Sequence, residues 1–191
     1  MSTLVMVKRG SEACIAAETL TSYGSMNLSA RYLTSPEKII AVGDAYVGIV
    51  GWAVTQTVLQ SAFASGCELP EIRTELELFE YARVLHRKLK EEYFLSAGPE
   101  RDEPFETSQI TAFVLNRYGM FGLYSLRSVD RYERFAAVGS GSRFALGAMY
   151  AAYELGLPVE DVARLGVEAG IEFDDASSGP ITIKRMKLEI A

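Results

Sequence analysis

The stretch "TLVMVKRGSEACIAAETLT", residues 3–21, sets the start of the fold. Its first half, "TLVMVKR", has the alternating apolar pattern of a strand, and "ACIAAETLT" is a second run of similar length. Between them stands Gly10-Ser11, a pair typical of hairpin turns. The chain therefore enters an antiparallel hairpin almost at its first residue, directly after the small hydroxyl residues Ser2 and Thr3.

The same kind of analysis extends over the rest of the chain. "KIIAVGDAYVGIVG" (38–51) predicts a second hairpin around Gly43-Asp44. In "TELELFEYARVLHRKLKEEYF" (74–94), one helix face is expected to consist of Leu76, Phe79, Val84, Leu85 and Leu89. The polar segment "SAGPERDEPFETS" (96–108) is expected to be a loop. Further helices are predicted at 52–66, 141–155 and 158–173, and further strands at 109–116, 119–126, 134–138 and 179–190.

The predicted order is strands, two helices, strands, two helices and a last strand. Two antiparallel sheets stacked together, with a helix pair on each outer face, would bury every apolar face in this order. We therefore expect an α+β fold, a four-layer αββα sandwich. With 191 residues and 49% hydrophobic content, the chain is expected to form a single domain, residues 1–191.

The composition limits the binding partners and the cellular compartment that we expect for this protein. The net charge of −6 argues against nucleic acid or an anionic membrane as the main partner, because both attract basic surfaces. No apolar run approaches the roughly 20 residues of a membrane span, and no signal peptide is visible. Cys14 and Cys67 do not make a disulfide framework, so we expect a cytoplasmic protein.

The lone histidine limits the chemistry. His86 lies in a helical segment among Arg83, Arg87 and Lys88, a poor setting for a general base, and we interpret it as an ordinary surface or boundary residue. No Cys/His spacing suits zinc, so neither a metal nor a cofactor is expected.

Two glycine- and serine-rich turns are weak signals when taken alone. "FAAVGSGSRFALG" (135–147) stands between a strand and a helix, but it matches neither G-x-G-x-x-G nor G-K-[ST]. We therefore favour a tight strand-to-helix turn over a phosphate-binding site. "FDDASSGPI" (173–181) has the pattern of a capped turn.

Taken in order, however, the chain start, Glu18, "KII", "VGIVG", "VGSGS" and "DDASSG" resemble the proteasome β-subunit family, which includes HslV, among the N-terminal-nucleophile hydrolases. The stretches "ERFAAVGSGSRFALGAMYAAY" (133–153) and "GVEAGIEFDD" (166–175) are most similar to the bacterial proteasome homologue group. The resemblance covers nearly the whole chain and implies the N-terminal-nucleophile hydrolase fold.

The resemblance implies that Ser2 is the nucleophile once Met1 has been removed. A hydroxyl needs an adjacent base, and in this family the α-amine of the same residue is that base. An α-amine has an ordinary pKa of about 7.7–8.0, so it is partly neutral near physiological pH without help from histidine.

The other expected roles follow from matching positions. Lys38 would favour deprotonation of the hydroxyl, Glu18 would pair with Lys38, and the Gly51 N–H would stabilise the oxyanion. The resemblance further assigns Ser140, Asp175 and Ser178 to the terminal amine, and Ile49, Thr21 and Gly51 to substrate binding, with Ile49 favouring apolar side chains.

The implied activity is a self-compartmentalising peptidase that cleaves unfolded proteins or peptides inside a homo-oligomeric double ring, a tetradecamer favoured over a dodecamer. An ATP-dependent unfoldase is a candidate partner. Ser2 and Glu18 stand where the family usually has Thr and Asp, which favours, as an alternative, a catalytically impaired ring acting as a scaffold or binding chamber. A small-molecule amidase of the same fold is a third hypothesis.

Overall fold

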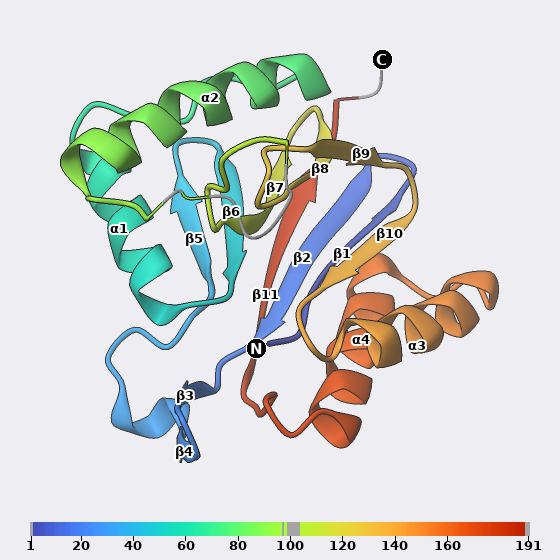
Figure 1. Cartoon of the computed structure of the whole chain (residues 1–191). Helices are drawn as coiled ribbons and strands as arrows, with labels where there is room; N and C mark the ends of the chain where they lie inside the picture. The colour runs from blue at the N-terminus through green and yellow to red at the C-terminus, as the bar shows by residue number, and fades with distance from the viewer. Residues whose placement is uncertain (1, 97, 99–103, 190–191) are drawn as a thin grey trace.

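The structure is a computed structural model that describes residues 2–96, 98 and 104–189. Two sheets lie between two helix pairs (Figure 1). Part of the expected loop at 96–108, namely residues 97 and 99–103, lies outside the described residues. The strands are β1 (Leu4–Arg9), β2 (Glu12–Glu18), β3 (Thr21–Tyr23), β4 (Met26–Leu28), β5 (Ile39–Val42), β6 (Ala45–Val50), β7 (Thr111–Asn116), β8 (Gly119–Leu123), β9 (Val129–Tyr132), β10 (Phe135–Val138) and β11 (Ile181–Lys187). The helices are a 3-10 turn at Ala30–Tyr32, α1 (Ala53–Ala64), α2 (Glu75–Glu92), α3 (Ser142–Glu154) and α4 (Val159–Phe173).

Both large sheets are antiparallel. The first has the order β10-β1-β2-β11, so the opening hairpin is flanked by strands from the second half of the chain. The second has the order β5-β6-β7-β8-β9. The predicted four-layer αββα sandwich of two antiparallel sheets is confirmed. The short hairpin β3-β4 and the strand β9 were not predicted from the sequence.

The first strand has both faces buried. Leu4 and Met6 point into the core between the two sheets, while Val5 and Val7 point into the core beneath α3 and α4. All four side chains are 0% exposed. Because a strand alternates its side chains between two faces, a run of apolar residues on both parities is what a strand in the middle of four layers requires.

Helix α2 shows which part of the sequence pattern was misleading. A capping box of Thr74 and Glu77 starts the helix. Its buried face runs through Leu78, Ala82, Leu85, His86 and Leu89. The expected face was therefore partly wrong: Leu76 is 68% exposed and Val84 is 44% exposed. The 3.6-residue repeat selects Leu78 and its neighbours one turn on, and Leu76 lies off that stripe.

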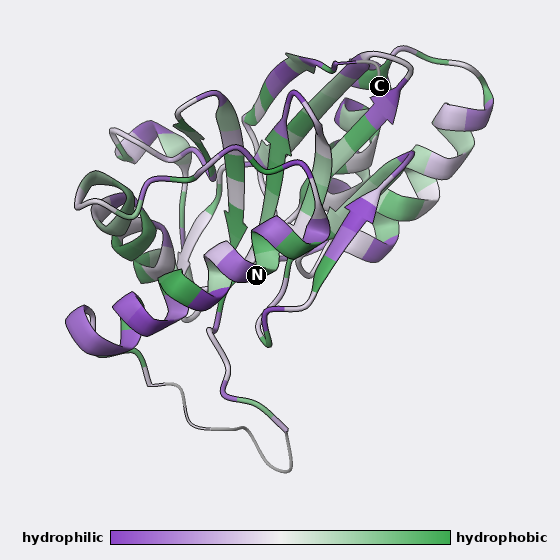
Figure 2. Cartoon of the chain, turned by 90° about the horizontal axis from the view of Figure 1, so that it is seen from above, coloured by the Kyte–Doolittle hydropathy of each residue, from purple (hydrophilic) through white to green (hydrophobic). Residues whose placement is uncertain are grey.

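Figure 2 shows hydrophilic and hydrophobic residues alternating along the outer helix α2, above strands that are mostly hydrophobic. In the described part of the chain, no helix is long and apolar enough to cross a membrane.

Gly139, directly after β10, lies against the chain start. A Cβ at this position would be 2.1 Å from the Ser2 carbonyl oxygen, and the φ of Gly139 is +96°, a backbone conformation that side chains rarely adopt. The Gly141 N–H donates to the same Ser2 oxygen at 3.2 Å. Glycine thus lets the turn after β10 approach the backbone of Ser2.

We predict that Gly139→Ala destabilises the protein by about 2–4 kcal/mol, because the new methyl group strains the backbone and displaces Ser2. Urea unfolding followed by circular dichroism measures this. Gly147→Ala is the matched control: Gly147 lies in α3 with nothing within 4 Å of an added Cβ, and alanine there should be neutral or stabilising by up to about 1 kcal/mol. Equal midpoints for the two variants would contradict the prediction.

Candidate active site

Ser2 lies two residues before β1, at the point where the two sheets and the turn after β10 meet. It is 2% exposed. Its backbone nitrogen donates to the Ser140 Oγ at 3.1 Å. In this chain, which begins with Met1, that atom is a peptide nitrogen, and it occupies the place that the α-amine would take after removal of Met1.

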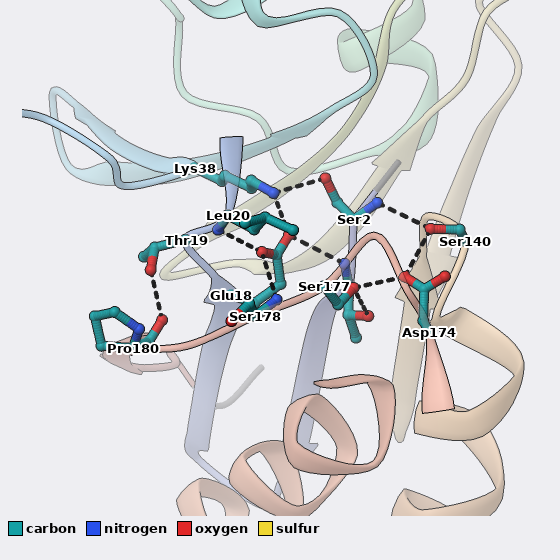
Figure 3. Close-up of polar contacts among 11 residues, drawn as sticks. Ser2, Glu18, Thr19, Leu20, Lys38, Ser140, Asp174, Ser177, Ser178 and Pro180 are labelled. Atoms are coloured by element: carbon teal, nitrogen blue, oxygen red, sulfur yellow. Dashed lines mark hydrogen bonds and ion pairs between the residues drawn. The ribbon is translucent and has the colours of Figure 1, made fainter. Parts of the chain in front are cut away.

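Lys38 brings a positive charge to the Ser2 side chain. The Lys38 Nζ donates to the Ser2 Oγ at 2.9 Å and also forms an ion pair with the Glu18 Oε1 (Figure 3). Lys38 stands just before β5 of the second sheet, whereas Glu18 ends β2 of the first. The pair therefore connects the two sheets directly beside the Ser2 hydroxyl.

The Glu18 carboxylate is 0% exposed and is held by backbone N–H groups as well as by Lys38. Its Oε2 accepts from the Leu20 N–H at 2.6 Å and from the Ser178 N–H at 3.4 Å, and its Oε1 accepts from the Thr3 N–H at 3.4 Å. A buried carboxylate is tolerated when it is paired and hydrogen-bonded in this way. The glutamate side chain at position 18 therefore reaches the Lys38 ammonium.

Burial lowers the pKa of Lys38 below its ordinary value of 10.5, and the negative charges of Glu18 and Asp174 oppose this effect. The Lys38 side chain is 12% exposed. Desolvation thus makes the ammonium easier to deprotonate than a surface lysine, even with a carboxylate beside it.

A chain of hydroxyl groups leads from the Ser2 nitrogen to Asp174. The Ser140 Oγ donates to the Asp174 Oδ2 at 2.8 Å, and the Ser177 Oγ donates to the same oxygen at 2.7 Å. Behind Ser177, the Thr3 Oγ1 lies 2.8 Å from the Ser177 Oγ. These contacts bring together β1, the turn after β10 and the turn after α4.

The residues that join this network stand one position before the expected pair Asp175 and Ser178. Asp174 and Ser177 join the network, whereas Asp175 is exposed and is not among its hydrogen-bonded residues. Ser178 contributes a backbone N–H to Glu18 rather than a hydroxyl to the amine. The sequence "DDAS-S" carries the Asp-x-x-Ser spacing twice, and only the backbone direction after α4 decides which pair points inward.

A cavity of about 380 Å³ opens beside the Ser2 hydroxyl. Thr21, Ile49 and Gly51, the expected substrate-binding residues, all line it, together with Lys38. Gly51 has a φ of +116°, so a residue with a side chain would be strained there. Lys38 is the one charged residue among the described residues that line this cavity.

Two residues that could suggest other chemistry lie elsewhere. His86 is 8% exposed rather than at the surface, because it belongs to the inner face of α2; its Nδ1 lies 3.0 Å from the Ser108 Oγ and its Nε2 3.2 Å from the Glu106 Oε2. Cys14 is buried against α4, and burial raises the pKa of its thiol to about 12, which makes it a poor nucleophile. Within the described residues, no group of three or more His, Cys, Asp or Glu residues could hold a metal ion.

Comparison with solved structures identifies similar chains. The protein titled "Thiobacillus denitrificans BPH in complex with Epoxomicin" is 41% identical, with a TM-score of 0.91, and the match covers 98% of this chain and 100% of that one. A structure titled "Thiobacillus denitrificans BPH" also gives 41% and 0.91, covering 98% of each chain. HslV from Trypanosoma brucei is 16% identical with a TM-score of 0.70, covering 97% of this chain and 99% of that one, a likeness of fold alone. No protein-family model and no curated protein sequence matches the chain.

We predict that Glu18→Gln lowers the free energy of unfolding by about 3 kcal/mol or more, because it leaves the buried Lys38 ammonium without its counter-charge. Urea unfolding near neutral pH measures the loss. Glu133→Gln makes the same substitution in the Lys8–Glu133 pair, whose carboxylate side chain is 73% exposed, and should cost about 1 kcal/mol or less. A loss of the same size in both variants would show that the buried Glu18–Lys38 pair contributes no more to the free energy of unfolding than an exposed pair does.

Proposed function

This chain belongs to the proteasome β-subunit family, in the group of the bacterial proteasome homologue, and we propose that it is an N-terminal-nucleophile peptidase with Ser2 as its nucleophile. The observation that carries the proposal is the 2.9 Å contact between the Lys38 Nζ and the Ser2 Oγ, with Glu18 behind the lysine. A cation beside a hydroxyl favours its deprotonated form, which is the form that attacks.

Removal of Met1 turns the Ser2 nitrogen from an amide into an amine. An amide nitrogen is a poor base because its lone pair is delocalised into the carbonyl group, whereas an α-amine takes up a proton near neutral pH. The reaction then needs no histidine.

The proposed chemistry has two halves. The Ser2 Oγ bonds to the carbonyl carbon of the scissile peptide bond while its proton passes to the Ser2 α-amine. The C–N bond breaks, the departing amine takes that proton, and the acyl group stays on Ser2 as an ester. Water then attacks the ester carbonyl and gives a proton to the α-amine; cleavage of the ester C–O bond returns this proton to the Ser2 oxygen and releases the carboxylic acid.

Gly51 is proposed to supply the oxyanion donor through its backbone N–H. Its place in the wall of the cavity beside Ser2, and its positive φ, support this role. A preorganised donor of this kind stabilises the transition state by about 3–4 kcal/mol.

The cavity beside Ser2 is proposed to receive the substrate side chain that precedes the scissile bond. Ile49 lies in its wall at 4% exposure, and Thr21 lies in the strand β3 that borders it. Since the Lys38 charge is paired with Glu18, an uncharged side chain fits this cavity best, and Ile49 favours an apolar one.

The assembly is proposed to be a cytoplasmic double ring of seven subunits each, which would enclose the sites, with unfolded proteins or peptides as substrates. Support comes from the outer face of the α3–α4 pair, where large apolar residues are exposed: Phe144, Tyr150, Leu155, Leu165 and Phe173. An exposed apolar surface of this kind is typical of a protein-protein contact. An ATP-dependent unfoldase remains the candidate partner for substrate delivery.

The alternative function is a ring with an impaired site that acts as a scaffold or binding chamber. Ser2 favours it, because serine lacks the β-methyl group that restricts the rotamer of threonine. Glu18 does not favour it, since its carboxylate reaches Lys38. The test of nucleophile reactivity below separates the two functions.

The first test is covalent labelling with a peptide epoxyketone, chosen because the Thiobacillus relative is titled as a complex with epoxomicin. Intact mass spectrometry should show that Met1 is absent and that one inhibitor adds per chain. Ser2→Ala should take up no inhibitor and lose peptide cleavage by more than about 1000-fold. Ser11→Ala, a change in the β1-β2 turn, is the control and should label like the wild type. Labelling of Ser2→Ala, or none of the wild type, would refute Ser2 as the nucleophile.

The second test is the mass of the assembly in solution. Size-exclusion chromatography with light scattering should give roughly fourteen times the chain mass of 21.0 kDa. A species of 21.0 kDa would contradict self-compartmentalisation and would favour the small-molecule amidase instead.

A further inference from the structure

We infer that Thr3, the residue directly after the nucleophile, is a positioning residue that keeps the Ser2 α-amine able to act as a base. The inference rests on the proposed function of Ser2. It starts from the chain of hydrogen bonds that leads from Thr3 through Ser177, Asp174 and Ser140 to the Ser2 nitrogen.

The direction of each hydrogen bond follows from counting protons. The Ser177 hydroxyl has a single proton and donates it to the Asp174 Oδ2, so at the 2.8 Å contact between Thr3 and Ser177 the donor is Thr3. The Ser140 hydroxyl also donates to Asp174, which leaves its oxygen to accept from the Ser2 nitrogen. Every hydroxyl dipole in the network therefore points toward Asp174.

This direction matters for the α-amine. When the Ser140 oxygen accepts a hydrogen from the amine, the nitrogen lone pair stays available for the proton of the Ser2 hydroxyl. If Ser140 turned and donated instead, that lone pair would be engaged and the amine would lose basicity. Because Thr3 donates a hydrogen bond to the Ser177 oxygen, the Ser177 hydroxyl keeps donating to Asp174, and this favours the orientation in which Ser140 accepts from the amine.

The surroundings hold Thr3 in this orientation. Thr3 is 0% exposed. Two glycines let neighbouring backbone approach it: a Cβ at Gly141 would lie 2.0 Å from the Thr3 Oγ1, and one at Gly170 would lie 2.3 Å from the same atom. Thr3 is not among the described residues that line the cavity beside Ser2, so it acts on the amine without touching the substrate side chain.

The test compares Thr3→Val, which keeps the shape and removes the hydroxyl, with Thr3→Ser, which keeps the hydroxyl. Thr3→Val should lower kcat by about 10- to 100-fold with KM nearly unchanged, and Thr3→Ser should recover most of the lost kcat. Rates are referred to correctly folded protein, measured by circular dichroism and assembly mass. A purely structural role would lower the amount of folded protein and leave kcat of the folded fraction intact, and that result would overturn the inference.

A double-mutant cycle checks the route. If Thr3 acts through Ser177, then Thr3→Val combined with Ser177→Ala should lower kcat no further than Ser177→Ala alone. Multiplying losses would show that Thr3 acts independently of Ser177 and would overturn the route.

A third measurement does not need peptide cleavage. The Ser2 α-amine of the processed protein is titrated by NMR, and in Thr3→Val its pKa should be lower than in the wild type. A wild-type protein that cleaves no peptide would refute the proposed function alone, and the titration would still decide the role of Thr3: identical titrations would overturn it.

Discussion

The ion pair between Glu18 and Lys38 joins the two stacked sheets at the site. The carboxylate comes from the end of β2, the ammonium from the residue before β5, and both lie where little water can reach them. Such a pair is favourable only when its remaining polar atoms are satisfied, and the backbone N–H groups of Leu20 and Ser178 meet that requirement. The position of the Ser2 hydroxyl against Lys38 therefore depends on the correct stacking of both sheets, not on the first strand alone.

The second support of the site is close approach at glycine. The turn after β10 touches the backbone of Ser2 because Gly139 carries no side chain, and the α3–α4 side of the molecule approaches Thr3 through Gly141 and Gly170. The contacts on the two sides of Ser2 thus differ in kind. On the Lys38 side a buried charge pair fixes the hydroxyl, and on the other side tightly packed hydroxyl groups fix the nitrogen.

Much of this could be predicted from the sequence, because periodicity and glycine turns determine the strands, the helices and the four layers. The charged strand β9, "VDRY", lacked such a signal: Asp130 and Arg131 are exposed, so its sequence has no apolar run. The stretch "DDASS" fits one spacing in two ways, and only the path of the backbone after α4 selects Asp174 and Ser177. Thr3 was missed because a buried hydroxyl becomes informative only when its partner, 174 positions away, is known.

The burial of β1 limits the time at which the proposed removal of Met1 could occur. The strand β10, which pairs with β1, and the strand β11, which pairs with β2, are made late in translation, so the sheet around Ser2 cannot close until the ribosome has nearly finished the chain. Ser2 is 2% exposed once folding is complete. The proposed removal of Met1 would then take place on the nascent chain, before the strand is enclosed. The proposed nucleophile would thus be generated before the cavity beside Ser2 is formed.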